Sequence, residues 1–381
     1  MKEKKFLFLL STLAVALLLS LSVTAMAKTP ESILKTLAKN GFSESDLGDI
    51  DQQLIVPAAW TAGAKKEGKV TVLSTMDEDQ WNVMRDMFEA RYPFIKISYS
   101  RASHEDRANK TVEAFRAGRF VTDIITGIGG NFYMFKDAGA LWDMSSIPQW
   151  QAIPPPFFKD ADHGLWVGIH RRYWGWAYNT DLVKRKDLPN TYDEVLTNPL
   201  FRNGNLAIGN RPQLWLLALW TERGKDWTLN FMDKLFKVVK PQRRKEGMNA
   251  MVQFLGAGEW HINVPAGAYR VKGHAGTGSP VSWYSPEPLT VATSELAIMS
   301  NAQSPNAARL LVNWWLSREG MLAQYIGDGA PPSREDMMKD KYLPYPKEII
   351  GKKLAMRSPQ SELEIQPLLA ERWNKLWLGQ H

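Results

Sequence analysis

Residues 69–74 read KVTVLS, an apolar and β-branched run that is typical of a buried strand. Residues 78–92 follow, and their large apolar side chains recur at the spacing of one helical face: Trp81, Met84, Phe88 and Tyr92. Pro93 ends this helix, because the residue before a proline is disfavoured in the α conformation. The stretch therefore predicts a strand followed by a helix, the unit from which parallel sheets are built.

The same alternation continues on the C-terminal side. Residues 95–100 and 121–125 predict two further strands, with a helix from Ser103 to Gly118 between them. Further strand-like runs are 165–169, 173–178, 206–209, 260–264 and 290–299. They form two groups, 69–170 and 173–298. This pattern predicts an α/β protein with two lobes, in which helices cover the faces of mainly parallel sheets.

The N-terminus predicts export. Residues 1–5 carry three lysines, residues 6–23 are almost wholly apolar, and Ala25-Met26-Ala27 fits a cleavage site. We therefore expect a signal peptide over residues 1–27 and a periplasmic mature protein. A retained N-terminal anchor is the alternative, because the apolar run is long for a signal peptide. No other run is long enough to suggest a membrane span.

Composition excludes several classes of site. The chain has 381 residues and no cysteine, so disulfides, cysteine-ligated metals and thiol nucleophiles are excluded. The net charge of +7 falls to +5 when Lys2, Glu3, Lys4 and Lys5 are removed, a mild excess that favours an anionic ligand. Basic residues are dispersed apart from residues 240–245 (KPQRRK), so we expect no nucleic-acid partner.

Catalytic motifs are incomplete. Residues 63–70 (GAKKEGKV) approach a phosphate-binding loop, but Val70 stands where a serine or threonine is needed. His104 and Glu105 begin a zinc motif that Ala108 breaks. Residues 127–130 (GIGG) begin a dinucleotide loop without its last glycine. We expect no catalytic residues, no cofactor and no resident metal; a secreted hydrolase or lyase is the enzymatic alternative.

Four passages, in order, resemble the solute-binding proteins of ABC importers, specifically the iron(III)-type family. They are residues 64–75 (AKKEGKVTVLST), 88–97 (FEARYPFIKI), 177–182 (AYNTDL) and 304–320 (SPNAARLLVNWWLSREG), the last followed by Pro332-Ser333-Arg334. The resemblance covers most of residues 58–340. Residues 28–57 look like an addition to the family pattern.

The resemblance implies a type II-like periplasmic-binding-protein fold with a ligand cleft between two lobes that close like a hinge. We expect the chain to cross between the lobes near 168–178 and 290–300. The predicted parts are a signal peptide, a helical extension and two discontinuous lobes: 1–27, 28–57, 58–170 plus 299–330, and 171–298 plus 331–381. The resemblance implies a monomeric carrier for an ABC permease and ATPase, and a sensory binding protein of the same fold is the alternative.

The predicted ligand is a small anionic organic molecule. Loops at the carboxyl ends of strands supply the first-lobe candidates: Ser74, Thr75, Arg101, Thr126 and Gly127. The second lobe supplies Arg211, Tyr269 and Trp283. Iron-binding members use adjacent tyrosines, whereas here Ala268 precedes a single Tyr269. Ferric ion held by Tyr269 with His170 or Glu105 is therefore the alternative ligand.

Overall fold

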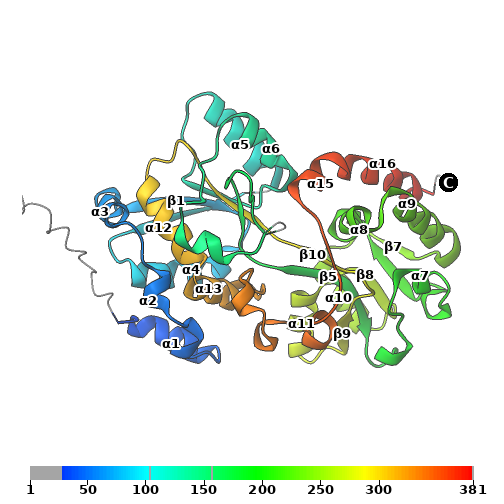
Figure 1. The fold of residues 1–381 in the computed structure, drawn as a ribbon. Helices are drawn as coiled ribbons and strands as arrows, with labels where there is room; N and C mark the ends of the chain where they lie inside the picture. Colours follow the sequence, from blue (N-terminus) through cyan, green and yellow to red (C-terminus); the bar gives the residue numbers. More distant parts are fainter. Residues whose placement is uncertain (1–27, 103, 156–157, 380–381) are drawn as a thin grey trace, which may run out of the picture.

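The computed structural model describes residues 28–102, 104–155 and 158–379. The predicted signal peptide, residues 1–27, lies outside the described residues. Two sheets form the centres of two α/β lobes that lie side by side, joined by extended segments (Figure 1). The predicted α/β class and two-lobed architecture are confirmed. In the described part of the chain, no helix has both the length and the apolar character required to cross a bilayer.

The first sheet contains the strand that opened the sequence argument. Its order is β2-β1-β3-β11-β4, and its strands are β1 (Lys69–Ser74), β2 (Lys96–Arg101), β3 (Ile124–Thr126), β4 (Val167–Gly168) and β11 (Glu295–Ile298). β1 pairs in parallel with both β2 and β3, as the repeated strand–helix units predict. β11 pairs antiparallel with β3 and β4. The carboxyl ends of β1, β2 and β3 therefore lie at one edge of this sheet.

Helices cover both faces of the first sheet. They are α3 (Ala58–Glu67), α4 (Glu78–Arg91), α5 (His104–Arg116), α6 (Phe132–Asp137), α12 (Pro305–Trp315) and α13 (Arg318–Asp328). Trp81, Met84 and Phe88 of α4 are fully buried, which confirms the predicted apolar face. Trp314 and Trp315 are also buried, and their indole N–H groups donate to Glu319 and Gln324.

The N-terminal extension packs on the first lobe. It contains α1 (Glu31–Lys39), the 3₁₀ turn η1 (Glu44–Leu47) and α2 (Ile50–Gln53). Phe42 packs against Tyr325 and Tyr342, with ring centroids 5.9 and 6.0 Å away. Residues 28–57 thus enlarge the first lobe at its base, where α1 and α2 lie in Figure 1.

The second sheet has the order β12-β10-β5-β8-β6-β7, with β9 paired to β5. Its strands are β5 (Arg172–Asn179), β6 (Leu206–Gly209), β7 (Gln242–Arg244), β8 (Ile262–Gly267), β9 (Val281–Tyr284), β10 (Leu289–Ala292) and β12 (Leu354–Met356). β6 pairs in parallel with β7 and β8, whereas β5 is antiparallel to β8, β9 and β10. The sheet is mixed because the crossing strand β5 enters it against the local direction.

The helices of the second lobe surround this sheet. They are α7 (Tyr192–Val195), α8 (Leu216–Arg223), α9 (Lys225–Lys234) with a π-helical turn η7 (Leu235–Val239), α10 (Met248–Gly256), α11 (Ala268–Gly276), α14 (Pro346–Ile349), α15 (Pro359–Glu364) and α16 (Gln366–Trp377).

Short 3₁₀ turns occur in both lobes. They are η2 (Gly129–Asn131), η3 (Pro148–Ala152), η4 (Arg185–Asp187), η5 (Pro199–Phe201), η6 (Pro212–Leu214), η8 (Glu335–Met337) and η9 (Asp340–Tyr342).

The chain passes between the sheets where the sequence places the crossings. It leaves β4 at Gly168 and enters β5 at Arg172, then leaves β10 at Ala292 and enters β11 at Glu295. The expected single strand 290–299 is thus two strands in different sheets. β11 belongs to the first sheet, although the predicted second lobe extends to residue 298.

A third passage follows α13. Arg334 donates to Gln149 and to the Leu316 carbonyl of the first lobe at 2.7 and 2.9 Å, whereas β12 pairs with β10 in the second sheet. The segment from residue 331 therefore contacts the first lobe before it joins the second. The division of the chain into lobe segments as a whole stays a prediction.

Candidate functional site

The carboxyl ends of β1 and β3 carry the three hydroxyl candidates of the first lobe, Ser74, Thr75 and Thr126. Ser74 and Thr126, at the ends of neighbouring strands, are almost completely buried, and the Thr126 hydroxyl donates to Ser74 Oγ at 2.7 Å. Thr75 is exposed beside them. The structure thus brings these candidates together, but only Thr75 presents its hydroxyl to solvent.

Gly127 adopts a left-handed conformation, with a φ angle of 62°, which glycine tolerates better than other residues. Its N–H donates to the Glu295 carbonyl at 2.6 Å, and its carbonyl accepts from Arg107 at 2.5 Å. Burial lowers the pKa of Arg107 to about 10. Arg107 lies in the segment that resembles a broken zinc motif, and sequence reasoning missed its role in holding this loop.

Two glutamates accept hydrogen bonds from backbone N–H groups further along the same loop. Glu295 of β11 accepts from the Gly129 N–H at 3.0 Å, and Glu362 of α15 accepts from the Gly130 N–H at 2.8 Å. Burial, and then the nearby Glu362 charge, raise the pKa of Glu295 to about 7. Sequence reasoning missed both glutamates, because 166 and 232 residues separate them from their glycine partners.

Arg101 ends β2 directly opposite Ser74 in the strand register. Its guanidinium forms an ion pair with Asp77 at 3.0 Å, and both side chains are more than half exposed. The predicted Arg101 therefore lies at the carboxyl edge of the first sheet, but with an acidic neighbour.

Tyr269 lies in the first turn of α11 in the second lobe and is half-buried. The guanidinium carbon of Arg172 lies 4.6 Å from its ring centroid, and that of Arg270 lies 5.4 Å away. Arg270 donates to the Tyr269 hydroxyl at 3.0 Å and also to Asn249. Trp174 packs edge-on, with ring centroids 6.5 Å apart. Two guanidinium groups at one phenol are suited to bind an anion, because arginine forms paired hydrogen bonds with carboxylate and phosphate.

Arg172 connects this tyrosine to the first lobe. It donates to Asp328 of α13 at 2.9 Å and to His170 Nε2 at 3.0 Å. The other ring nitrogen of His170 contacts Gln324 at 2.6 Å. Burial, followed by the Arg172 charge, lowers the pKa of His170 well below its usual value. Both ring nitrogens of His170 are thus engaged within the protein, which argues against the predicted ferric ligand role.

The other members of the ferric alternative are described only in part. The Glu105 side chain lies outside the described residues. Among the residues that the structure describes, no group of three His, Cys, Asp or Glu side chains is arranged to hold a metal ion. Tyr269 is therefore the member of the proposed ferric set that the structure leaves half-exposed.

The last two candidates have contrasting positions. Trp283 is 1 % exposed, donates to the Ala266 carbonyl at 2.9 Å and stacks on Tyr345 with centroids 5.7 Å apart. It belongs to the core of the second lobe, because its indole has a partner and its faces are covered. Arg211 is exposed at the loop that follows β6 and precedes η6.

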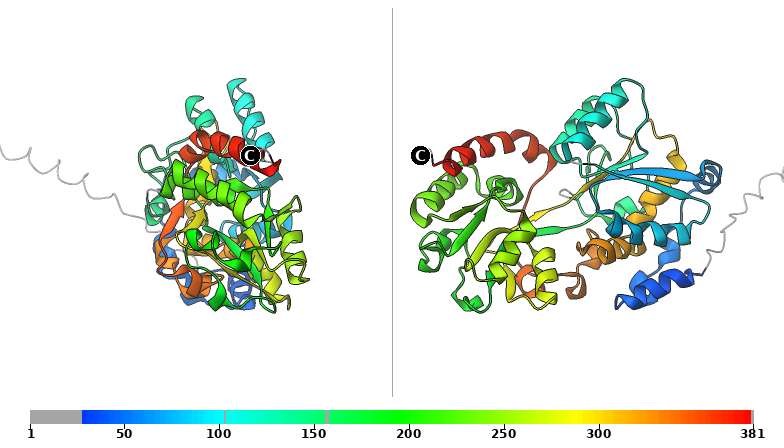
Figure 2. Two further views of the ribbon diagram at one scale, coloured as in Figure 1. Left: turned by 90° about the vertical axis from the view of Figure 1, so that its right-hand side faces the viewer. Right: turned by 180° about the vertical axis from the view of Figure 1, so that it is seen from behind.

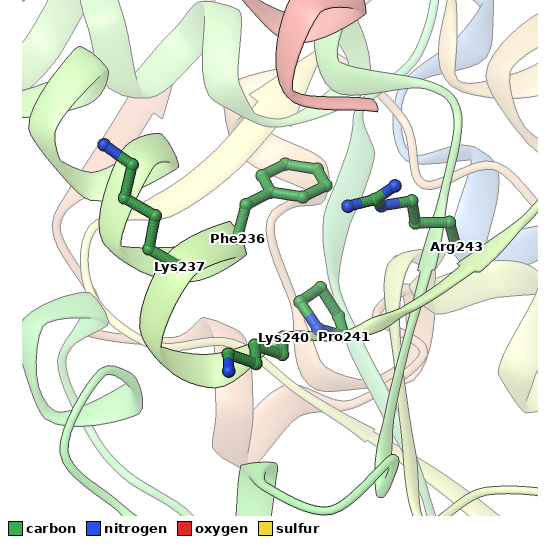
Figure 3. A pocket seen from close by; sticks show the side chains of 5 residues that line it. All are labelled: Phe236, Lys237, Lys240, Pro241 and Arg243. Carbon is green, nitrogen blue, oxygen red and sulfur yellow. The ribbon is translucent and has the colours of Figure 1, made fainter. Parts of the chain in front are cut away.

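A surface cavity of about 570 Å³ lies away from these residues. It is formed by the π-helical turn and the start of β7, and Figure 3 shows its lining: Phe236, Lys237, Lys240, Pro241 and Arg243. It includes part of the basic run at residues 240–245. Arg243 is held there, because it donates to the Trp377 carbonyl at 3.1 Å. The cavity shares no residue with the candidate site.

Comparisons with known proteins agree with this architecture. The family model described as bacterial extracellular solute-binding protein matches residues 57–322. No curated protein matches the chain. Among solved structures, iron-bound HitA from Pseudomonas aeruginosa superposes with a TM-score of 0.65 and 17% identity, covering 82% of this chain and 98% of that chain.

Two further structures show the same fold. A Trichodesmium protein (IdiA, FutA) in complex with iron and citrate has a TM-score of 0.67 at 17% identity, covering 81% of this chain and 99% of that one. AfuA from Actinobacillus pleuropneumoniae, with fructose-6-phosphate bound, has a TM-score of 0.61 at 17% identity, covering 82% and 98%. At such identities the likeness establishes the fold.

Proposed function

The chain belongs to the bacterial extracellular solute-binding proteins, and from this premise we propose that it captures a small anionic organic solute between its lobes. The captured solute is delivered to the permease and ATPase of an ABC importer in the inner membrane. The protein acts as a monomeric periplasmic carrier after removal of residues 1–27. It breaks no bond in its ligand, so it is not an enzyme.

One observation carries the choice of an anion: the guanidinium groups of Arg172 and Arg270 both approach the ring of Tyr269. Asp328 pairs with Arg172, so these three ionised groups leave one positive charge in excess. Arginine binds carboxylate and phosphate groups with two parallel hydrogen bonds. The position next to a lobe crossing suits a ligand that stabilises the closed arrangement.

The first lobe contributes a polar edge. We propose that Thr75 and Arg101 contact the ligand, and that Ser74, Thr126 and Gly127 shape the loop between them. In the second lobe we propose Arg211, Tyr269 and Arg270 as contacts. Trp283 is not included, because its ring is covered by the core.

Ferric ion is the second candidate, and Tyr269 again supports it. The half-buried Tyr269 phenol, to which Arg270 donates, offers an oxygen donor of the hard kind that suits ferric ion. HitA and the Trichodesmium protein were both solved with iron. Ferric loading would give a visible phenolate-to-iron band, and colourless protein after addition of ferric citrate would exclude this candidate.

The decisive experiment is native mass spectrometry of protein purified from the periplasm. We expect an organic anion at one molecule per chain, and the same compound should raise the melting temperature of stripped protein. Tyr269→Phe distinguishes the candidates: it abolishes ferric binding but retains the ring beside the two guanidiniums. Protein without a bound mass, and with no thermal shift from carboxylates, phosphate esters or ferric citrate, would overturn the proposal.

A further inference from the structure

The helix α15 lies between the two lobes. It follows β12 at the edge of the second sheet and leads directly into α16. It contacts η2 and α6 of the first lobe and α8 of the second. Figures 1 and 2 show this red segment reaching from the second lobe to the first along one side of the molecule. It lies outside the part of the chain that the family model matches, residues 57–322.

Its C-terminal side is fixed to the second lobe. Four side chains of α16 are buried there: Leu369, Trp373, Leu376 and Trp377. The Trp373 indole N–H donates to Asn210 at 2.7 Å, in the loop after β6. Arg372 forms an ion pair with Asp233 at 2.5 Å. The apolar burial and these polar contacts make α16 part of the second lobe.

On the side facing the first lobe, α15 contacts Gly130. The Glu362 carboxylate accepts from the Gly130 N–H at 2.8 Å, and Arg357 approaches the same carboxylate at 3.4 Å. A Cβ atom at Gly130 would lie 2.8 Å from the Cβ of Glu362 and 3.1 Å from its backbone carbon. Such a close approach leaves no room for a side chain at position 130. The contact therefore depends on glycine.

We infer that α15 is an interlobe clasp, in which Glu362 fastens the Gly130 loop of the first lobe to the second lobe. Separation of the lobes at this side breaks the Glu362–Gly130 bond and uncovers the loop. The clasp also removes the Gly130 amide from ligand binding, because Glu362 already accepts from it, as Glu295 of the first lobe does from the Gly129 amide. This inference rests on the proposed function only in assuming that the lobes move.

Amide hydrogen exchange tests the contact directly, without any ligand. Glu362→Ala removes the acceptor, and Gly130→Ala forces the helix away from the loop. We expect exchange at residue 130 and across residues 359–364 to rise at least tenfold in both variants. Glu364→Ala is the matched control, because Glu364 is exposed on the same helix. Gly273→Ala, where a Cβ meets open space, controls for the glycine substitution.

A distance measurement tests whether the contact restrains the lobes. Because the chain has no cysteine, spin labels attach only at introduced ones. Glu113→Cys in α5 and Lys225→Cys in α9 give one exposed label on each lobe. Pulsed electron–electron double resonance measures the distance between the two labels. The distance distribution should be broader in the Glu362→Ala variant than in the labelled protein that retains Glu362. It should not change in the Glu364→Ala variant.

Three outcomes would overturn the clasp. Unchanged exchange in both variants would mean that the helix stays seated without the contact. Faster exchange with an unchanged distance distribution would mean that the contact does not restrain the lobes. An equal effect of Glu364→Ala would mean that Glu362 has no special role. If Gly130→Ala fails to fold, Glu362→Ala alone decides. Because no solute is present, none of these outcomes bears on solute capture.

Discussion

Two junctions between the lobes differ in their balance of charge. At the carboxylate junction, Glu295 and Glu362 accept from the glycine amides of the loop after β3, with Arg107 and Arg357 close by. At the guanidinium junction, Arg172 and Arg270 approach the ring of Tyr269, and Asp328 is the paired carboxylate. In the first, both glycine N–H groups are matched by acceptors inside the protein, and two arginines balance the two glutamates. The second retains a positive excess, which is what an anionic ligand requires.

The contrast separates structural from ligand-binding polar groups. Both sets lie at lobe crossings, and both contain residue types that occur in binding sites. A backbone N–H bound to an internal carboxylate has no capacity left for a solute. Burial alone does not distinguish structural polar groups from ligand-binding ones. The number of hydrogen-bond and ion-pair partners within the protein does.

The largest expected effect is on the free energy of unfolding, and it concerns Trp283, which supports the guanidinium junction. Trp283 bonds the carbonyl of Ala266, three residues before Tyr269. Trp283→Ala should lower the free energy of unfolding by about 3–5 kcal/mol, the usual cost of removing a buried aromatic side chain. Urea denaturation measures this. Phe254→Ala is the control, because that ring is 38% exposed and should cost much less. Equal, small losses would show that Trp283 is not a core residue.

The second prediction concerns the carboxylate junction and pH. The pKa of Glu295 is about 7 in the folded protein, against 4.5 for the free group. Between these values the folded state holds a proton that the unfolded state has lost, so stability should fall as pH rises from 4.5 to 7. The contribution is roughly 1–3 kcal/mol. Glu295→Gln should remove this part of the pH dependence.

The measurement compares urea denaturation of the two proteins at several pH values, because other groups titrate in the same range. His170 is one of them, and burial lowers its pKa, which gives a slope of opposite sign. The difference between unmodified protein and Glu295→Gln isolates Glu295. A difference that stays constant from pH 4.5 to 7 would contradict the raised pKa.

The third prediction tests the positive excess. Arg270→Ala and Arg211→Ala should each weaken binding of the co-purified organic anion by about 1.5–3 kcal/mol, the scale of a hydrogen bond to a charged group. Isothermal titration calorimetry measures the affinities. Lys272→Ala on the same helix is the control, because that side chain is exposed. Unchanged affinity in both arginine variants would remove the proposed anion site.

The smallest effect is expected at the edge of the first lobe. Arg101 already pairs with the exposed Asp77, so Arg101→Ala should weaken binding by less than about 1 kcal/mol. The same titrations at low and high salt measure it, since exposed charges are screened. A loss as large as that of Arg270→Ala would show that Arg101 exchanges Asp77 for the ligand.

Local patterns predicted local structure well. The strand at residues 69–74 was predicted with its observed bounds, and the helix at 78–92 differs by one residue. Ser304 and Pro305 mark the start of α12, where a proline at the first helical position is common. The prediction of one strand over residues 290–299 was wrong, because both of the strands in this stretch are mostly apolar. Only the change of sheet at Thr293 and Ser294 divides them, and strand periodicity does not record which sheet a strand joins.

The candidate site was predicted less completely. Ser74, Thr75, Thr126 and Gly127 do gather at one edge, because the ends of parallel strands must meet there. Trp283 looked equivalent to Tyr269 in the sequence, but the structure covers its ring. Arg270 was visible beside Tyr269, yet nothing in the sequence indicated that its guanidinium meets the phenol. Arg172 was one arginine among many.

The sequence by itself determined the alternation of strands and helices and the family, because these depend on residues that are near one another in the chain. Only the tertiary structure decided which polar groups are already satisfied. Glu362 reaches Gly130 across 232 residues, and Arg172 reaches Asp328 across 156. Hydrogen bonds and ion pairs depend on distance in space, and packing of the two lobes sets that distance.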